Sequence, residues 1–195
     1  MSMSRLTPER TDELYAATLR LLAEVGYDKL TMDRIAEETR SSKATLYRQW
    51  GSKEALVVAA IDADAPAVPE SVDTGTLRGD LMALLEALPR DDDRDIALAA
   101  AILHACKSHP SLAQSFNDRV VATRVQVVTT VVDRAIARGE VAADNPAIPF
   151  VVPTLIGPAI LREALTGEQC GPDYFIEILD AVLLPALGVT PPTTP

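Results

Sequence analysis

Signals for helix starts recur at short intervals through the first third of the chain. Thr7-Pro8, Thr31, Ser42 and Ser52 each place a cap-forming hydroxyl ahead of a segment with apolar residues at helical spacing. Gly26 ends the first of these segments. Helix starts at such short intervals predict several short helices. No alternation of apolar and polar residues, which is typical of strands, stands out. The sequence therefore predicts an all-α fold.

The remainder of the chain continues the helical pattern after a proline-containing linker that begins at Asp62. Helical spacing and breakers predict further helices over 76–88, 96–106, 111–138 and 172–187. The valine-rich centre of the longest segment has strand propensity, but its length and its stop at Gly139 favour a helix. Prolines 149, 153 and 158 predict a bent helix in the segment that follows Asn145-Pro146.

The charge is divided unevenly along the 195 residues. The net charge of −10 argues against a simple nucleic-acid coat, because phosphate neutralisation needs a basic surface. Residues 1–61, however, are neutral, with nine basic and nine acidic residues, so the whole acidic excess lies in 62–195. This asymmetry predicts two parts with different partners. We expect domains at 1–61 and 62–189, followed by a disordered tail at 190–195.

Several classes of protein are disfavoured by the composition. No apolar run approaches the roughly 18 residues that a membrane span needs, and the polar start of the chain is unlike a signal peptide. Two cysteines, Cys106 and Cys170, are too few for a disulfide scaffold, which favours the cytoplasm. His104 and Cys106 are too few for a zinc site. No metal, cofactor, nucleophile–base pair or phosphate loop is indicated, which disfavours an enzyme.

Residues 31–50 form the pattern that carries the functional prediction. Two short helical segments, joined by a tight polar turn, make a helix-turn-helix arrangement. The second helix needs an apolar face against the first and a polar face for the major groove. Ala44, Leu46 and Trp50 are expected to face inward. The outward residues are expected to be Ser42, Lys43, Thr45, Tyr47 and Arg48.

The same region is locally basic. Residues 39–53 contain no acidic residue and four cations, namely Arg40, Lys43, Arg48 and Lys53. Cations, hydroxyls and helix N-termini are the groups that contact DNA phosphates. The pattern therefore predicts a double-stranded DNA-binding surface in a chain whose net charge points the other way.

Residues 27–56, reading YDKLTMDRIAEETRSSKATLYRQWGSKEAL, resemble the DNA-binding domain of TetR-family transcriptional regulators. The pieces SKATLYRQW and SKEAL are similar to the family pattern at the right spacing. The run from His109-Pro110 to Gly139-Glu140, and LIGPAI further on, are similar to the family's C-terminal domains. Arg40-Ser41 departs from the Gly-Val that many members carry in the turn, which makes a left-handed turn residue less comfortable.

The resemblance implies a role for each matching residue. Thr45 and Arg48 would read base edges, with Arg48 suited to guanine. Phosphate contacts would come from Thr31, Arg40, Ser42, Lys43, Tyr47 and Lys53. Alternatives stay open here: Tyr47 packs in the core, Lys53 is an ordinary cation of the capping turn, and Trp50 is a core anchor.

The resemblance also implies a helical ligand-binding and dimerisation domain in the C-terminal part. The last two long helices would pair across a two-fold axis to form a homodimer on a palindromic operator. The expected interface residues are Ile160, Leu161, Phe175, Ile178, Leu179, Val182 and Leu183. The alternative is that this apolar stripe covers the subunit's own core.

The favoured function is a transcriptional repressor that a small apolar ligand releases from DNA. The ligand pocket is expected between the helix that precedes the linker and the helices of 76–138, with Phe116 and Phe150 as the aromatic exceptions in an aliphatic lining. Two alternatives are a DNA-binding regulator without a ligand and a small-molecule enzyme that retains a helix-turn-helix. Ligand-induced thermal stabilisation would distinguish the repressor from the regulator without a ligand. Turnover without DNA binding would support the enzyme.

Overall fold

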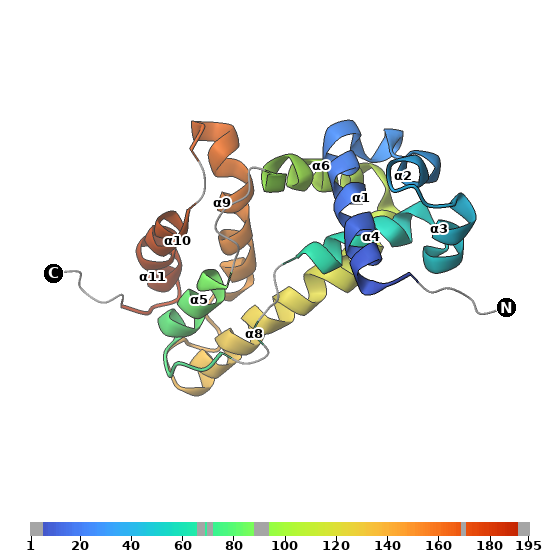
Figure 1. Cartoon of the computed structure of the whole chain (residues 1–195). Coiled ribbons are helices and arrows are strands. Elements are labelled where there is room, and N and C mark those ends of the chain that lie inside the picture. The colour runs from blue at the N-terminus through green and yellow to red at the C-terminus, as the bar shows by residue number, and fades with distance from the viewer. Residues whose placement is uncertain (1–5, 66–68, 70–71, 88–93, 169–170, 191–195) are drawn as a thin grey trace. The chain divides into compact units, whose positions relative to one another are not determined.

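The computed structural model describes residues 6–65, 69, 72–87, 94–168 and 171–190, without the side chains of 94–96, 159–160, 163–164 and 172. Within these ranges the chain is helical and has no strand, which confirms the predicted fold class (Figure 1). No helix in these ranges is long and apolar enough to cross a membrane. The helices are α1 (Pro8–Lys29), α2 (Met32–Glu38), α3 (Lys43–Trp50), α4 (Lys53–Asp64), α5 (Leu77–Glu86), α6 (Arg94–Ser108), α7 (Pro110–Phe116), η1 (Asn117–Val121), α8 (Ala122–Ala137), η2 (Ile148–Phe150), α9 (Val151–Thr166), α10 (Pro172–Ile178), η3 (Leu179–Leu183) and α11 (Leu184–Ala186).

Hydroxyl caps fix where the helices of the first third begin. Thr7, Thr31, Ser42 and Ser52 each accept a hydrogen bond from the backbone N–H three residues later, at 3.0–3.3 Å. Each such cap stabilises its helix by about 1 kcal/mol. Gly26, with φ of +75°, interrupts the first helix where the sequence predicts its end, and the chain makes one further turn before Leu30. Helix α4 runs three residues beyond the predicted end at Ile61.

The described chain divides into two compact units, and the first contains residues 1–65 and 92–122. Here α1 packs on α4 and α6, α2 packs on α3, and α4 packs on α7 and η1. The core combines Leu14 and Leu22 of α1 with Leu46 of α3 and Leu56 of α4. Helices α6 and α7 thus complete the core of the N-terminal helices, although they follow residue 61 in the sequence.

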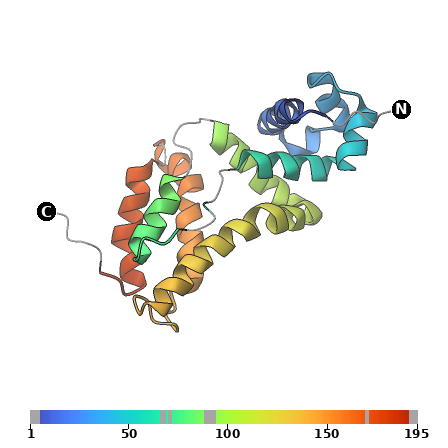
Figure 2. The same cartoon turned by 60° about the horizontal axis from the view of Figure 1, so that its bottom comes forward.

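The second unit contains residues 66–91 and 123–195. Helix α10 packs on α5 and α9, and Figure 2 shows these three helices side by side. The valine-rich segment forms helix α8, as the spacing predicts, and buries Val131 and Val132. Helix α9 continues through Pro158, while Pro149 lies in the short turn η2 that precedes it. The predicted last helix is present as α10, η3 and α11 in succession.

Three of the expected dimer-interface residues are instead part of the chain's own interior. Phe175, Leu179 and Leu183 are 8%, 0% and 2% exposed within the single chain, so they cannot form a surface for a partner. Their helix turns this face toward the rest of the second unit, where Leu179 and Leu183 join the core. The prediction is corrected for these three residues.

The other interface candidates remain at the surface. Leu161 and Val182 are exposed, and Ile178 is half-buried. The side chain of Ile160 lies outside the described residues, as do residues 191–195 of the expected disordered tail and Cys170.

A buried polar network closes the second unit at the start of α5. Asp80, which is fully buried, accepts hydrogen bonds from the backbone N–H and the hydroxyl of Thr74, at 2.6 and 2.8 Å, and pairs with Arg138 at 3.2 Å. Glu140 links Arg138 to the backbone N–H of Leu77. The network therefore ties the loop before α5 to the end of α8.

A second polar contact holds α5 against the C-terminal helices. The guanidinium of Arg78 donates two hydrogen bonds to the two carboxylate oxygens of Asp180, at 2.7 and 2.8 Å. A bidentate pair of this kind fixes orientation as well as distance. The contact therefore fixes the direction in which α5 lies on η3.

Candidate nucleic-acid interface

Helices α2 and α3 are joined by a tight turn over residues 39–42. The backbone N–H of Ser41 bonds to the carbonyl of Ala36 at 2.9 Å, which closes the end of α2. Arg40 has φ of +49°, the one positive φ outside glycine among the described residues. It occupies the left-handed position that the family pattern fills with glycine. Arg10 of α1 donates to the carbonyl of Thr39 and so ties α1 to the same turn.

Helix α3 is anchored by two residues one turn apart. Leu46 is fully buried, and half-buried Trp50 donates from Nε1 to the Tyr15 hydroxyl at 3.2 Å, with the two rings in edge contact. Trp50 is therefore a core anchor, which is one of the alternatives raised from the sequence. Ala44, expected to face inward, is exposed, because a helix that buries positions 46 and 50 turns position 44 to the opposite side.

The exposed face of α3 is centred on Arg48. Tyr47 and Arg48 are both exposed, and so is Ala44 one turn before Arg48. Within the described part of the chain, the Arg48 guanidinium makes no hydrogen bond or ion pair, and Tyr47 is not a core residue. The long, exposed side chain of Arg48, beside the small Ala44, is suited to enter a groove in DNA.

The hydroxyls at the helix starts are already engaged as caps. Thr31 caps α2 and Ser42 caps α3, and both residues are exposed. Thr45 is half-buried, and its hydroxyl lies 2.8 Å from that of Ser42. The Thr45 hydroxyl is therefore shared with Ser42, which leaves its methyl group as the uncommitted part of the side chain.

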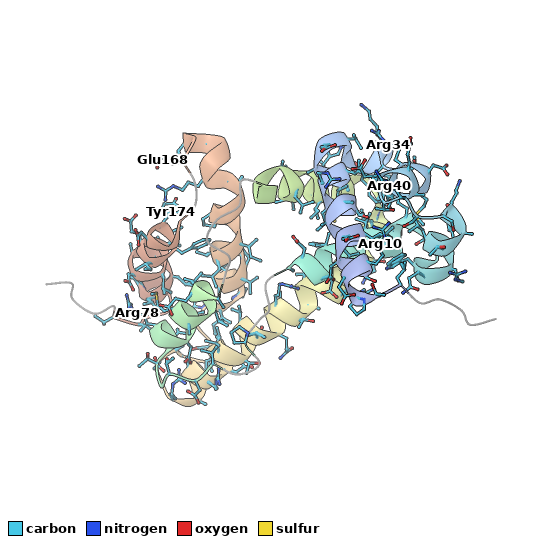
Figure 3. The ribbon with its side chains drawn as sticks, viewed as in Figure 1. Arg10, Arg34, Arg40, Arg78, Glu168 and Tyr174 are labelled. Carbon is cyan, nitrogen blue, oxygen red and sulfur yellow. The ribbon has the colours of Figure 1, made fainter. Side chains whose placement is uncertain are left out.

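The four cations of the basic stretch lie in different environments. Arg48 and Arg40 are exposed and make no ion pair in the described ranges. Lys43 contacts Asp33 at 2.8 Å, and this hydrogen bond and charge raise the pKa of Lys43. Arg34, which lies before the basic stretch in the sequence, is also exposed, and Figure 3 labels it with Arg40. The groove that these two arginines line also contains Glu37 and Glu38, so it is not uniformly basic.

Lys53, a predicted phosphate contact, binds groups of its own chain. Its ammonium donates to the carbonyl of Tyr27 at 2.9 Å and lies 3.8 Å from the centre of the Tyr27 ring. Partial burial lowers its pKa. The ammonium is thus engaged at the junction of α1 and α4. Lys53 is only half-buried and an ammonium has three donors, so its phosphate contact stays a prediction.

Lys53→Met tests whether Lys53 acts in the fold or at the DNA interface. We expect a loss of about 1–2 kcal/mol in unfolding free energy, because the charged hydrogen bond and the cation–π contact are removed while the stem is kept. Affinity for duplex DNA should change little. Lys107→Met, on the exposed part of α6, is the matched control. Weaker DNA binding with unchanged thermal stability would place Lys53 at the interface.

His104 and Cys106 do not assemble a metal site in the described ranges, where no group of three or more His, Cys, Asp or Glu side chains is placed to hold an ion. Cys106 is half-buried, and burial raises the pKa of its thiol. A thiol in this environment is mostly protonated and weakly nucleophilic near neutral pH.

A short helix anchored through one face and exposed through the other, after a tight turn from its neighbour, defines the class of helix-turn-helix regulators. Two family models match the chain: "Bacterial regulatory proteins, tetR family" over residues 14–60, and "Tetracyclin repressor-like, C-terminal domain" over residues 71–182. The chain belongs to the TetR family of transcriptional regulators, and the members of this family are DNA-binding regulators and not enzymes.

Relatives extend the match over most of the chain. An uncharacterised regulator of Mycobacterium tuberculosis is 35% identical over 91% of this chain and 88% of its own length. A DNA-binding transcriptional repressor of Mycobacteroides abscessus is 33% identical over 90% of this chain and 92% of its own length. The solved structure of the flavonoid-responsive regulator FrrA has a TM-score of 0.66 at 23% identity, covers 96% of this chain and all of its own, and supports the fold alone.

Proposed function

We propose that the protein is a sequence-specific transcriptional repressor that binds a palindromic operator as a homodimer and is released by a small apolar ligand. The exposed face of α3 carries this proposal, because Arg48 has no partner there among the described residues and Leu46 holds the opposite face in the core. A helix held in this way is suited to the major groove. The repressor named in Mycobacteroides abscessus supports the direction of control.

The proposed contacts follow the environments of the side chains. Arg48 reads guanine, and Ala44 and Thr45 lie where methyl groups meet thymine. Phosphates are contacted by Thr31, Arg40, Ser42, Lys43 and Tyr47. The proposed domains are residues 1–61 for DNA binding and 62–189 for ligand binding and dimerisation, with α1 and α4 of the first domain completing the ligand site. The proposed location is the cytoplasm.

The proposed dimer forms through an apolar face on α9. Phe150 lies directly before this helix, and Leu161 and Leu165 lie one turn apart on the same side of it; the three are between 55% and 79% exposed. Exposed apolar side chains gathered on one side of a helix mark an interaction surface. Val182 of η3 adds to this set. A two-fold axis through it would give two α3 helices for the two halves of a palindrome.

The ligand is proposed to enter the apolar interior of the first unit. Apolar side chains of α1, α4, α6 and α7 meet there around a space too small for a water molecule. The helices must therefore separate to admit a compound, because ordinary ligand pockets enclose roughly 300–1,000 Å³. Phe116 lies in this lining, whereas Phe150 is exposed on the second unit. The lining is Leu22, Tyr27, Val57, Ile61, Ile102, Ala105, Cys106, Leu112 and Phe116.

Selection of bound duplexes from a random pool tests the proposed function. We expect a palindromic motif from the wild type, and a motif altered at a guanine position from Arg48→Ala, because loss of a bidentate contact costs about 1–3 kcal/mol at one base pair. Arg119→Ala, in η1, is the matched control and should leave the motif unchanged. Recovery of no motif would contradict the proposal, and an unaltered motif from Arg48→Ala would contradict the base-reading role.

A further inference from the structure

Lys43, the first residue of α3, is held by an acidic side chain from the first turn of α2. Its Nζ lies 2.8 Å from Oδ1 and 2.9 Å from Oδ2 of Asp33. The two side chains are 50% and 70% exposed. Asp33 lies two residues after Thr31, and Lys43 follows Ser42. The pair therefore joins the starts of the two helices whose caps are proposed to contact phosphates.

A carboxylate in this place opposes DNA binding in two ways. It occupies an ammonium that would otherwise meet a phosphate, and its own charge repels the backbone. An exposed ion pair contributes little to the free energy of folding, so stability does not explain why Asp33 lies beside Lys43. Because the exposed pair is weak, a phosphate can displace the carboxylate when DNA binds.

We propose that the Asp33 carboxylate competes with DNA phosphate for the Lys43 ammonium. This inference rests on the proposed function. Each α3 helix that docks exchanges one carboxylate for one phosphate, and this exchange lowers affinity for every DNA sequence. Binding at the salt concentration of the cell then depends more strongly on the base contacts of Arg48. Asp33 thus limits non-specific association without touching a base.

The test uses the full chain and a fluorescent duplex of random sequence, so that no operator needs to be known. Binding is measured over about 50–300 mM KCl for the wild type, Asp33→Asn, Lys43→Gln and the double variant. Asp33→Asn should bind about 3- to 10-fold more tightly at low salt, with a smaller gain at high salt. Lys43→Gln should bind more weakly, and Asp33→Asn should gain clearly less in that background.

Asp144→Asn is the matched control, because it makes the same charge change at an exposed position of the second unit. It should change affinity little. Asp33→Ser, which keeps a residue suited to the start of a helix, repeats the measurement, and circular dichroism confirms that each variant is folded.

The outcomes separate the inference from the proposed function. Unchanged or weaker binding by Asp33→Asn and Asp33→Ser overturns the inference. Equal gains with and without Lys43 also overturn it, since Asp33 would then act by simple repulsion. A wild-type chain that fails to bind any duplex at low salt overturns the proposed DNA-binding function itself.

Discussion

Leu161→Glu is expected to leave the chain folded but monomeric, and to lower its affinity for a palindromic duplex by at least about 100-fold. Leu161 is 55% exposed and lies on the apolar face of α9, so glutamate is tolerated in the free subunit. In a two-fold interface each subunit would bury a charge without a partner. Loss of the dimer removes the gain from binding two half-sites at once. Sedimentation equilibrium and fluorescence anisotropy measure the two effects.

Leu103→Glu is the matched control for this prediction. Leu103 is also about half exposed, but it lies on α6 in the first unit. The Leu103→Glu variant should remain dimeric and bind the same duplex with unchanged affinity. A dimeric Leu161→Glu variant would show that the α9 face is not the interface.

Asp80→Ala is expected to lower the free energy of unfolding by about 2–4 kcal/mol, because it leaves the Arg138 guanidinium and the backbone N–H of Thr74 without their buried acceptor. Chemical denaturation followed by circular dichroism measures the loss. Asp73→Ala is the control, since Asp73 also lies near Arg138, at 3.5 Å, but is 59% exposed. It should cost less than about 1 kcal/mol. Equal losses for the two variants would contradict a special role for the buried carboxylate.

The pH dependence of the same measurement gives an independent check. Burial by itself would raise the pKa of Asp80, but hydrogen bonds from Thr74 and the Arg138 pair outweigh it and lower the pKa. Because the folded pKa lies below the unfolded one, this stabilisation is complete above about pH 4 and is lost as pH falls through the folded pKa. Unfolding free energy of Asp80→Ala should therefore fall less steeply in acid than that of the wild type.

Local chemistry made much of the fold predictable. The caps at Thr31, Ser42 and Ser52 act within three residues, so their sequence signal is sufficient to place α2, α3 and α4. The departure from glycine at the turn marks Arg40 as an unfavourable left-handed residue, and Arg40 nevertheless adopts a φ of +49°. The π-helical segment η1 inside the long predicted helix has no comparable sequence signal.

Contacts between residues far apart in sequence could not be predicted. Lys53 is satisfied by a carbonyl 26 positions earlier, and Asp80 pairs with an arginine 58 positions later. Composition and periodicity carry no information on either partner. Phe175, Leu179 and Leu183 were assigned to the dimer because an apolar stripe does not say whether its own chain or another covers it.

The position of α6 and α7 limits how the DNA-binding helices can be transferred to another protein. These helices come from the middle of the chain, yet Ala105 and Leu112 share a core with Leu22 and Val57. A fragment that stops after α4 would present that apolar surface to water. A chimaera that uses this DNA-binding unit must therefore contain residues 92–122 as well. The transferable unit is thus discontinuous in the gene.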